Sequence, residues 1–282
     1  MRHFAQAIAA YNPQEHRPLA HVYGIDLGVI TRSLGALVLW LLGYADRALA
    51  QSQEAWTLAQ EVAHPLSQVL APVWLACLHQ FRQEAQTAHD WAAGSIALAA
   101  QQGFSALYVA WATVPQGWAR TRQEQWAAGM AKLQEGSEAA LTTGSELWRP
   151  SFLALRAQAA GAAGQPEDGR RLLAEAQEVM ARTDERFYEA ELARLTGVWP
   201  LAHSPAAQAE AEAPMCHALE VARHQEAKSL ELRAAVSLCR LWQQQGKRIE
   251  ARKLLAPLYG WFTEGFDTAD LQEARALLEE SS

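Results

Sequence analysis

The sequence predicts an all-α protein whose helices pair into hairpins that stack as a right-handed solenoid. Three observations support this fold class. Small residues return with a period of about 40 residues, helix-favouring Ala, Leu, Gln and Glu are abundant, and no segment shows the alternation of apolar and polar residues typical of a strand. We expect about five to six hairpins followed by a C-terminal capping helix.

The period is marked by a glycine that ends one helix and by small residues at fixed distances after it. Three segments have this layout: GYADRALAQSQEAWTLA from Gly43, GQPEDGRRLLAEAQEVM from Gly164 and GKRIEARKLLAPLYGWF from Gly246. A small residue is expected where the two helices of a hairpin cross, and the position seven residues later faces the same way. The crossing positions are Ala48, Ala88, Gly129, Gly169, Ala211 and Ala251, and the later positions include Ala55, Gly136, Ala176, Ala218 and Leu258.

Residues 1–282 are expected to form one repeat domain. We assign a partial repeat to residues 1–20, an irregular connector to 21–30, the repeats to 31–258 and a C-terminal cap to 259–282. The first segment, HFAQAIAAYNP, matches the second helix of a hairpin without its first helix. An unpaired helix leaves an apolar face open, so we expect a partner or a further part of a longer chain to cover this end.

The C-terminal cap contains an unusual concentration of aromatic residues. A last hairpin has no successor to cover it, so we expect these residues to fold the final helix back over it. Thr268 is placed to cap the N-terminus of that helix. The aromatic residues are Tyr259, Trp261, Phe262 and Phe266.

The small residues at the helix crossings resemble those of the tetratricopeptide repeat (TPR), although the period here exceeds the 34 residues of that repeat. The segment AKSLELRAAVSLCRLWQQQGKRIEARKLLAPLYGWFTEGFDTADLQEARALL, together with LWLLGYADRALAQSQEA, AGQPEDGRRLLAEA and ERFYEAELARLTG, resembles the C-terminal helical-repeat tail of large bacterial signalling proteins. In those proteins a class III nucleotide cyclase or a protein kinase precedes an AAA-type ATPase module, and the repeats follow. The resemblance implies a regulatory segment of a larger protein, with those upstream modules among its partners.

Charge and composition argue against several classes of function. A net charge of −7 and a pI near 5.7 do not favour a phosphate-binding surface. Cys77, Cys216 and Cys239 lie far apart without a CxxC pair, which indicates neither a disulfide framework nor a zinc site. The longest apolar run, LGALVLWLL, is shorter than the ~20 residues of a membrane-spanning helix. We therefore expect a cytoplasmic protein without metal or cofactor that binds neither nucleic acid nor membrane.

First helices line the concave face of such a solenoid, so their large or charged residues are candidates for partner binding. Arg233 and Arg240 lie seven residues apart on one helix face, where two guanidiniums would clamp a carboxylate or phosphate unless Glu226 and Glu231 neutralise them. For the tryptophans the alternative is packing between hairpins, because each ring buries about 150–250 Å². The candidates are Trp40, Trp74, Cys77, Trp111, Trp118, Gln158, Arg233 and Arg240.

The connector HVYGIDLGVI interrupts the repeat pattern between residues 21 and 30. Irregular loops on a regular scaffold often carry function, which makes Tyr23 and Asp26 further candidates. The alternative is a structural linker in which Asp26 is a turn or cap residue.

These features predict a non-catalytic scaffold that binds a protein or peptide segment along the concave face. The phosphate-binding motif GxxxxGK[ST] and the nucleophile motif GxSxG are both absent from the sequence, and no catalytic residue is assigned. The alternative is a domain that senses a small-molecule effector, as in transcription activators of the maltose-regulon kind, whose helical repeats are of similar length. A deep pocket lined by Trp would favour sensing, whereas an open groove would favour protein binding.

Overall fold

The computed structural model describes residues 1–104, 106–203 and 208–280, and the regular elements within those ranges are all helices. The all-α prediction is therefore confirmed. The helices gather into two compact units. Unit 1 comprises Met1–Trp40 and Tyr44–Ser145, and unit 2 comprises Leu41–Gly43 and Glu146–Ser282. That the whole chain behaves as a single domain stays a prediction.

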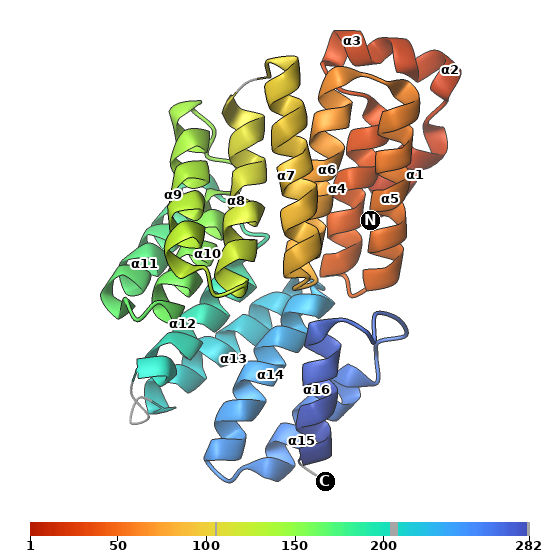
Figure 1. Cartoon of the computed structure of the whole chain (residues 1–282). Helices are drawn as coiled ribbons and strands as arrows, with labels where there is room; N and C mark the ends of the chain where they lie inside the picture. Colours follow the sequence, from red (N-terminus) through yellow and green to blue (C-terminus); the bar gives the residue numbers. More distant parts are fainter. Residues whose placement is uncertain (105, 204–207, 281–282) are drawn as a thin grey trace. The chain divides into compact units, whose positions relative to one another are not determined.

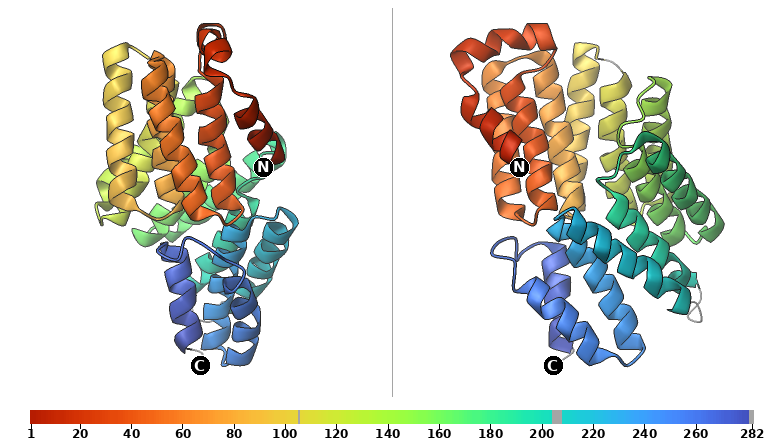
Figure 2. Two further views of the ribbon diagram at one scale, coloured as in Figure 1. Left: turned by 90° about the vertical axis from the view of Figure 1, so that its right-hand side faces the viewer. Right: turned by 180° about the vertical axis from the view of Figure 1, so that it is seen from behind.

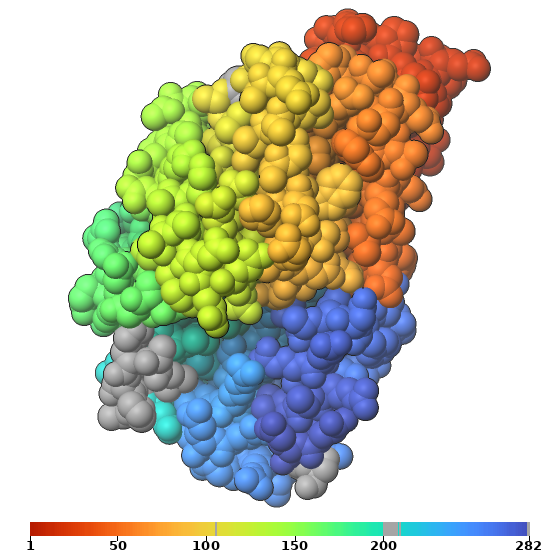
Figure 3. Space-filling model, in the orientation of Figure 1, coloured from red at the N-terminus to blue at the C-terminus, as the bar shows by residue number. Residues whose placement is uncertain are grey.

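Unit 1 begins with short helices and continues with the antiparallel hairpins α4–α5, α6–α7 and α8–α9 (Figure 1). Within this unit, α5 contacts α6 and α7 contacts α8. On the face shown in Figure 3, side chains of α7, α8 and α9 form a continuous surface. The elements are α1 (Arg2–Ala10), α2 (Pro13–His16), η1 (Arg17–Leu19), α3 (Ala20–Tyr23), α4 (Leu27–Leu41), α5 (Ala45–Val62), α6 (Pro65–Phe81), α7 (Ala85–Gln102), α8 (Ala106–Arg122) and α9 (Trp126–Thr142).

Unit 2 continues the same pattern with the hairpins α10–α11, α12–α13 and α14–α15 and ends with the single helix α16. The two views in Figure 2 both show α16 beside α14 and α15, with which it is in contact. Among the first helices of this unit, α10 contacts α12, α12 contacts α14, and α14 contacts α16. The bounds are α10 (Arg149–Ala162), α11 (Pro166–Thr183), α12 (Glu189–His203), α13 (Gln208–His224), α14 (Lys228–Gln244), α15 (Arg248–Tyr259) and α16 (Ala269–Glu280).

Residues in the left-handed backbone region mark the described turns of the repeat. Within hairpins they are Gly43, Gln83, Glu124, Gly164 and Gly246, with φ between 62° and 92°. Between hairpins they are Ala63, Gly103, Gly144, Asp184, Glu226 and Gly265, with φ between 52° and 80°. Both series advance by about 40 residues, which confirms the predicted period. The three glycines that revealed the repeat in the sequence therefore end the first helix of their hairpins, as expected.

The predicted crossing positions are buried between the helices of each hairpin. Ala48, Ala88 and Ala211 are 0% exposed and Ala251 is 2% exposed. Gly129 and Gly169 are buried as well. The positions seven residues later are also closed, with Ala55, Ala176 and Ala218 at 0% exposure. Small side chains at these places allow the paired helices to approach closely, as ridges-into-grooves packing requires.

The N-terminal helix α1 lies against α4 and turns its larger apolar side chains toward it. Phe4 and Ile8 are half-buried, and a Cβ at Gly35 of α4 would lie 3.5 Å from the Cβ of Phe4. No residue of α1 is fully buried, so the expectation that a partner or a further part of a longer chain covers this end stays a prediction. No single helix of the described residues is both long and apolar enough to cross a membrane, and one bent pair, Pro13–Tyr23 with Leu27–Leu41, meets those criteria by length and composition only.

The C-terminal helix α16 closes the last hairpin with an amphipathic face. Leu271, Ala274 and Leu277 are buried and join the apolar core of α14 and α15. Gln272, Arg275, Glu279 and Glu280 are exposed on its outer side, as a terminal capping element requires.

The aromatic residues before α16 divide between core and surface. Phe262 is 6% exposed and belongs to the core beneath α16, as predicted. Trp261 and Phe266 are 38% and 49% exposed, and their rings contact Phe262 and Tyr259, with centroids 5.2 and 6.0 Å apart, so these two residues close this end only in part. Thr268 precedes α16, but its hydroxyl donates to the carbonyl oxygen of Gly265 at 2.6 Å.

Candidate functional site

Three of the predicted first-helix candidates in unit 1 belong to the core. Trp40, Trp74 and Trp118 are 2–4% exposed, and the ring of Trp40 stacks on Phe81 with 4.8 Å between centroids. A partner would have to displace packed helices to reach these rings. The alternative of packing between hairpins therefore holds for these three residues, because large apolar rings stabilise the fold most when fully buried.

The other two unit 1 candidates remain partly accessible. Trp111 is half-buried, with its ring centroid 5.7 Å from that of Trp74 and 6.0 Å from that of Tyr108. Its buried Nε1 has no hydrogen-bond acceptor among the described residues. Burial raises the pKa of the half-buried Cys77 thiol to about 12, so this cysteine stays protonated and is a poor nucleophile.

The proposed anion clamp of unit 2 is not formed. Arg233 is 8% exposed, and its Nε donates to Oδ2 of Asp270 at 2.9 Å. Arg240 is exposed and pairs with Glu273 at 2.8 Å. Both guanidiniums are thus engaged by carboxylates of α16, a helix that the sequence interpretation did not bring against them. Gln158, the remaining candidate, is half-buried on α10.

A buried ionic cluster joins α12, α14 and α16. Arg194 donates to both carboxylate oxygens of Glu191, at 2.7 and 2.8 Å, and to Ser237 Oγ at 3.0 Å. Burial alone would raise the pKa of Glu191, but its attraction to and hydrogen bonds from Arg194 outweigh that effect and lower it. Together with Arg233 and Asp270 the cluster contains two cations and two anions, so it has no net charge to offer a ligand. The bond from Arg194 to Ser237 connects α12 with α14, and the bond from Arg233 to Asp270 connects α14 with α16.

The connector residue Asp26 is a structural cap. It is 0% exposed, and Oδ1 accepts a hydrogen bond from the backbone N of Val29 at 3.0 Å. Oδ2 accepts one from the Tyr11 hydroxyl at 2.8 Å, while its own N–H donates to Ser67 Oγ at 3.0 Å. Burial, reinforced by Asp26, raises the pKa of Tyr11 to about 12. The second connector candidate, Tyr23, is 61% exposed and stands at the end of α3.

No group of three or more His, Cys, Asp or Glu side chains in the described ranges is arranged to hold a metal ion. The expectation that the chain needs no metal stays a prediction.

A cluster that the sequence interpretation missed lies where two loops of unit 2 meet. We call Leu147, Trp148, Glu185 and Phe187 the aromatic loop patch. Leu147 is 50% exposed, and the other three are half-buried. The rings of Trp148 and Phe187 meet edge to face with 4.7 Å between centroids. Trp148 and Phe187 are about one repeat period apart in the sequence. This spacing could have indicated that they meet, because equivalent loops of successive hairpins lie side by side.

Trp148 and Glu185 hold the two loops of the patch together. Trp148 is the N-cap residue of α10 and adopts φ 70°, which is rare for a bulky side chain. Its backbone N–H donates to both Glu185 carboxylate oxygens, at 3.0 and 3.1 Å. Burial raises the pKa of Glu185, and the hydrogen bond from Trp148 lowers it by less.

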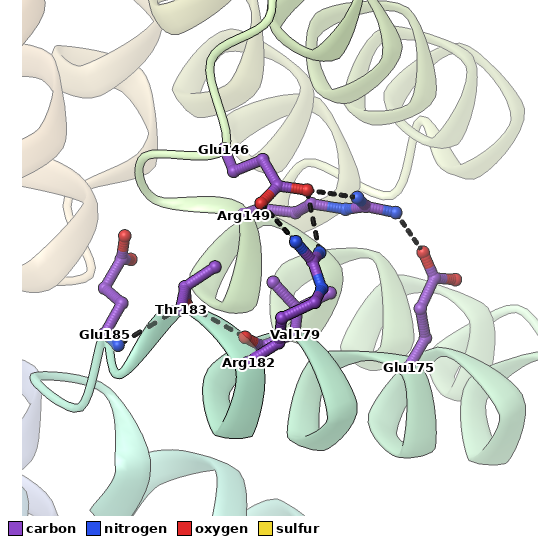
Figure 4. A network of polar contacts seen from close by, with 7 residues as sticks. All are labelled: Glu146, Arg149, Glu175, Val179, Arg182, Thr183 and Glu185. Carbon is purple, nitrogen blue, oxygen red and sulfur yellow. Dashed lines mark hydrogen bonds and ion pairs between the residues drawn. The ribbon is translucent and has the colours of Figure 1, made fainter.

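The arginines near the patch are occupied by other carboxylates. Arg182 binds both oxygens of Glu146 at 2.6 and 2.7 Å, and Arg149 bridges Glu146 at 3.3 Å and Glu175 at 2.7 Å (Figure 4). In Figure 4 the Glu185 carboxylate points away from both arginines. Within the described part of the chain, Glu185 therefore has no ion-pair partner.

Comparisons with known proteins show the fold but no family. No protein-family model matches the chain, and no curated protein matches its sequence. The solved structure of the apo form of RapI matches with a TM-score of 0.60 and 10% identity, over 89% of this chain and 84% of RapI. A Rap protein complexed with competence and sporulation factor matches with a TM-score of 0.62 and 8% identity, over 90% of this chain and 75% of that protein.

A weaker match is a signal transduction ATPase with numerous domains and a tetratricopeptide repeat sensor, from Pyrococcus horikoshii. It has a TM-score of 0.49 and 12% identity, over 99% of this chain and 42% of that protein, and no conclusion rests on it. The link to a cyclase or a kinase stays a prediction. The similarity to TPR-like repeat proteins confirms the predicted fold class of an α-solenoid.

Proposed function

We propose that this protein is a non-catalytic scaffold that binds a segment of another protein in the cytoplasm. One observation carries the proposal: the aromatic loop patch gathers half-buried Trp148 and Phe187 and half-exposed Leu147 around the Glu185 carboxylate, which has no ion-pair partner among the described residues. Aromatic side chains that are partly accessible beside a polar group are typical anchors of protein interfaces.

The similarity in fold to a Rap protein complexed with competence and sporulation factor supports the same proposal. Stacked helical hairpins present extended surfaces of side chains, and binding a polypeptide segment is a common use of such surfaces. Gln158 and Arg240 remain accessible on first helices of unit 2 and are further proposed contacts of that unit. Cys77 and Trp111 remain accessible on first helices of unit 1 and are proposed contacts of unit 1 by itself. We keep the proposal that the chain acts as a regulatory part of a larger signalling protein, with its cyclase, kinase or ATPase modules as partners.

A small-molecule sensor is the second candidate function, and Trp111 is the observation that favours it. The indole N–H of Trp111 is buried without an acceptor in the described residues and lies beside the rings of Trp74 and Tyr108. A buried donor without an acceptor costs free energy, which an effector bearing a hydrogen-bond acceptor would recover. Aromatic walls with a single polar group are typical of small-ligand sites.

Affinity capture followed by calorimetry tests the two functions against each other. The purified chain is used as bait, captured proteins are identified, and each is titrated as a purified component. Saturable binding of a purified protein or its peptide, which the Trp148→Gly variant weakens, supports the scaffold. Thermal stabilisation by a metabolite, lost in Trp111→Phe, without binding of any purified protein, would instead establish sensing.

A further inference from the structure

We propose that the aromatic loop patch receives the side chain of an arginine or lysine, flanked by an apolar residue, from the bound polypeptide. This inference rests on the proposed scaffold function and specifies the chemistry of its partner. The occupant follows from charge complementarity at Glu185 and from the rings beside it.

The first step is the charge of Glu185. The only donor to its carboxylate among the described residues is the backbone N–H of Trp148, which is shared between both oxygens. The positive end of the α10 dipole offsets part of the negative charge. Burial nonetheless raises the pKa of this carboxyl, which shows that its ionised form is incompletely compensated. A cation placed at the carboxylate would supply the missing compensation.

The second step is the pair of rings next to that carboxylate. Because the Glu185 oxygens lie 3.0 and 3.1 Å from the backbone N of Trp148, the carboxylate stands close to the base of the indole side chain. The Phe187 ring meets the indole at 4.7 Å between centroids. Aromatic faces attract guanidinium and ammonium groups, and Trp does so most strongly. A carboxylate and two rings together favour a cation over an anion or a neutral group.

The third step concerns the arginines that would compete for Glu185. Arg182 and Arg149 lie close by in sequence and structure, yet both are held by Glu146, and Arg149 is held by Glu175 as well. Arg186, the next residue, pairs with Asp184 at 2.6 Å and with Glu189 at 3.2 Å. These three arginines are therefore engaged by other carboxylates, and none of them forms an ion pair with Glu185 among the described residues.

The fourth step is the backbone of Trp148. A tryptophan with φ 70° is strained, and strain of this kind gathers at functional sites. Glycine would adopt the same conformation without strain. The indole ring of Trp148 is thus present at a position whose positive φ favours glycine. Leu147, the residue before it, is 50% exposed. Leu147 offers the apolar surface that a residue flanking the cation would cover.

The test is a selection of random 12-residue peptides displayed on phage against the full chain, followed by calorimetry with the synthesised winners. Glu185→Gln removes the charge but keeps an oxygen for the Trp148 N–H, and Trp148→Gly removes the ring while relieving the backbone. Glu178→Gln is the matched control, because Glu178 is an exposed glutamate of α11 outside the patch. Phe187→Leu replaces either variant if its melting temperature shows that it fails to fold.

We expect the winners to share a basic residue next to an apolar one, and their Kd to rise about tenfold in Glu185→Gln and in Trp148→Gly but not in Glu178→Gln. Winners without a basic residue, or winners that bind Glu185→Gln as tightly as wild type, would overturn this inference and leave the scaffold function standing. A selection without winners, together with affinity capture that yields no binding protein, would overturn both.

Discussion

In the hairpin α8–α9 of unit 1 and in the hairpin α10–α11 of unit 2, a glycine occupies the same repeat position, but different groups fill the space it leaves. In α8–α9, a Cβ at Gly129 would lie 2.7 Å from the backbone N of Thr121 and 2.9 Å from the carbonyl oxygen of Gly117. In α10–α11, a Cβ at Gly169 would overlap the ring of Trp199 from α12. The first glycine lets two backbones touch, and the second admits a side chain from the following hairpin.

This difference shows that a repeat position determines how large its residue can be, but not whether backbone or a side chain packs against it. In α8–α9 the small residue closes its own hairpin, whereas in α10–α11 it fixes the neighbouring hairpin through the ring of Trp199. The cost of adding a methyl group should therefore depend on whether the obstacle is backbone or side chain. Three glycine-to-alanine substitutions test this, at Gly129, Gly169 and Gly94, and a substitution of Glu191 tests the polar contacts of α12, from the largest expected effect to the smallest.

Gly129→Ala should destabilise the protein most, by about 3 kcal/mol, because two helix backbones would have to separate. The gain in helix propensity from Gly to Ala, about 1 kcal/mol, offsets only part of the strain. Urea unfolding at equilibrium, followed by circular dichroism, measures the change. A midpoint equal to that of wild type would mean that α8 and α9 are not in backbone contact.

Gly169→Ala should cost less, about 2 kcal/mol, because a ring moves more readily than a backbone. Trp199→Phe removes the atoms nearest to the new methyl group, so Gly169→Ala should cost at least 1 kcal/mol less in that background. A double-mutant cycle from four urea titrations gives this coupling energy. Additive effects would contradict the insertion of Trp199 between α10 and α11.

Glu191→Gln should cost about 1.5 kcal/mol at pH 7, because it weakens two charge-assisted bonds from Arg194 of the same helix, whose guanidinium also donates to Ser237 of α14. The folded state lowers the pKa of Glu191, so its contribution is present above the unfolded pKa, about 4.3, and is lost as pH falls through the lower folded value. The stabilities of wild type and variant should therefore converge as the pH falls below the lowered folded pKa of Glu191. A constant difference at every pH would show that the effect comes from packing.

The fold was largely predictable because its signal is local and repeated. Close helix crossings require small residues, so Ala48, Ala88 and Ala251 revealed the hairpins directly. The turns at Gln83 and Glu124 carry no glycine, so the hairpins that contain them were placed from the repeat period through Ala88 and Gly129. Gln and Glu are not typical turn residues, so residue type alone did not mark these two turns.

The candidate site was less predictable because its contacts join residues from different hairpins. The alternative that Asp26 is a cap followed from its place before a helix, and the structure confirms it. Trp40 and Trp118 are buried because the first helices pack on several sides, which periodicity does not reveal. Arg233 meets Asp270 across α14 and α16, and such pairs emerge only when the stacking of helices is known.

Gly94→Ala should have the smallest effect and the opposite sign, a stabilisation of about 0.5–1 kcal/mol. Gly94 lies inside α7, and a Cβ there would meet no heavy atom within 4 Å among the described residues. Alanine lowers the entropy of the unfolded chain and favours helix, with no steric cost in the folded state. The same urea titration as for Gly129→Ala measures both, so the pair separates helix propensity from backbone contact within unit 1. If Gly94→Ala lowered the unfolding midpoint, the expected gain from helix propensity would be absent. The loss of stability in Gly129→Ala could then no longer be assigned to the contact between the backbones of α8 and α9.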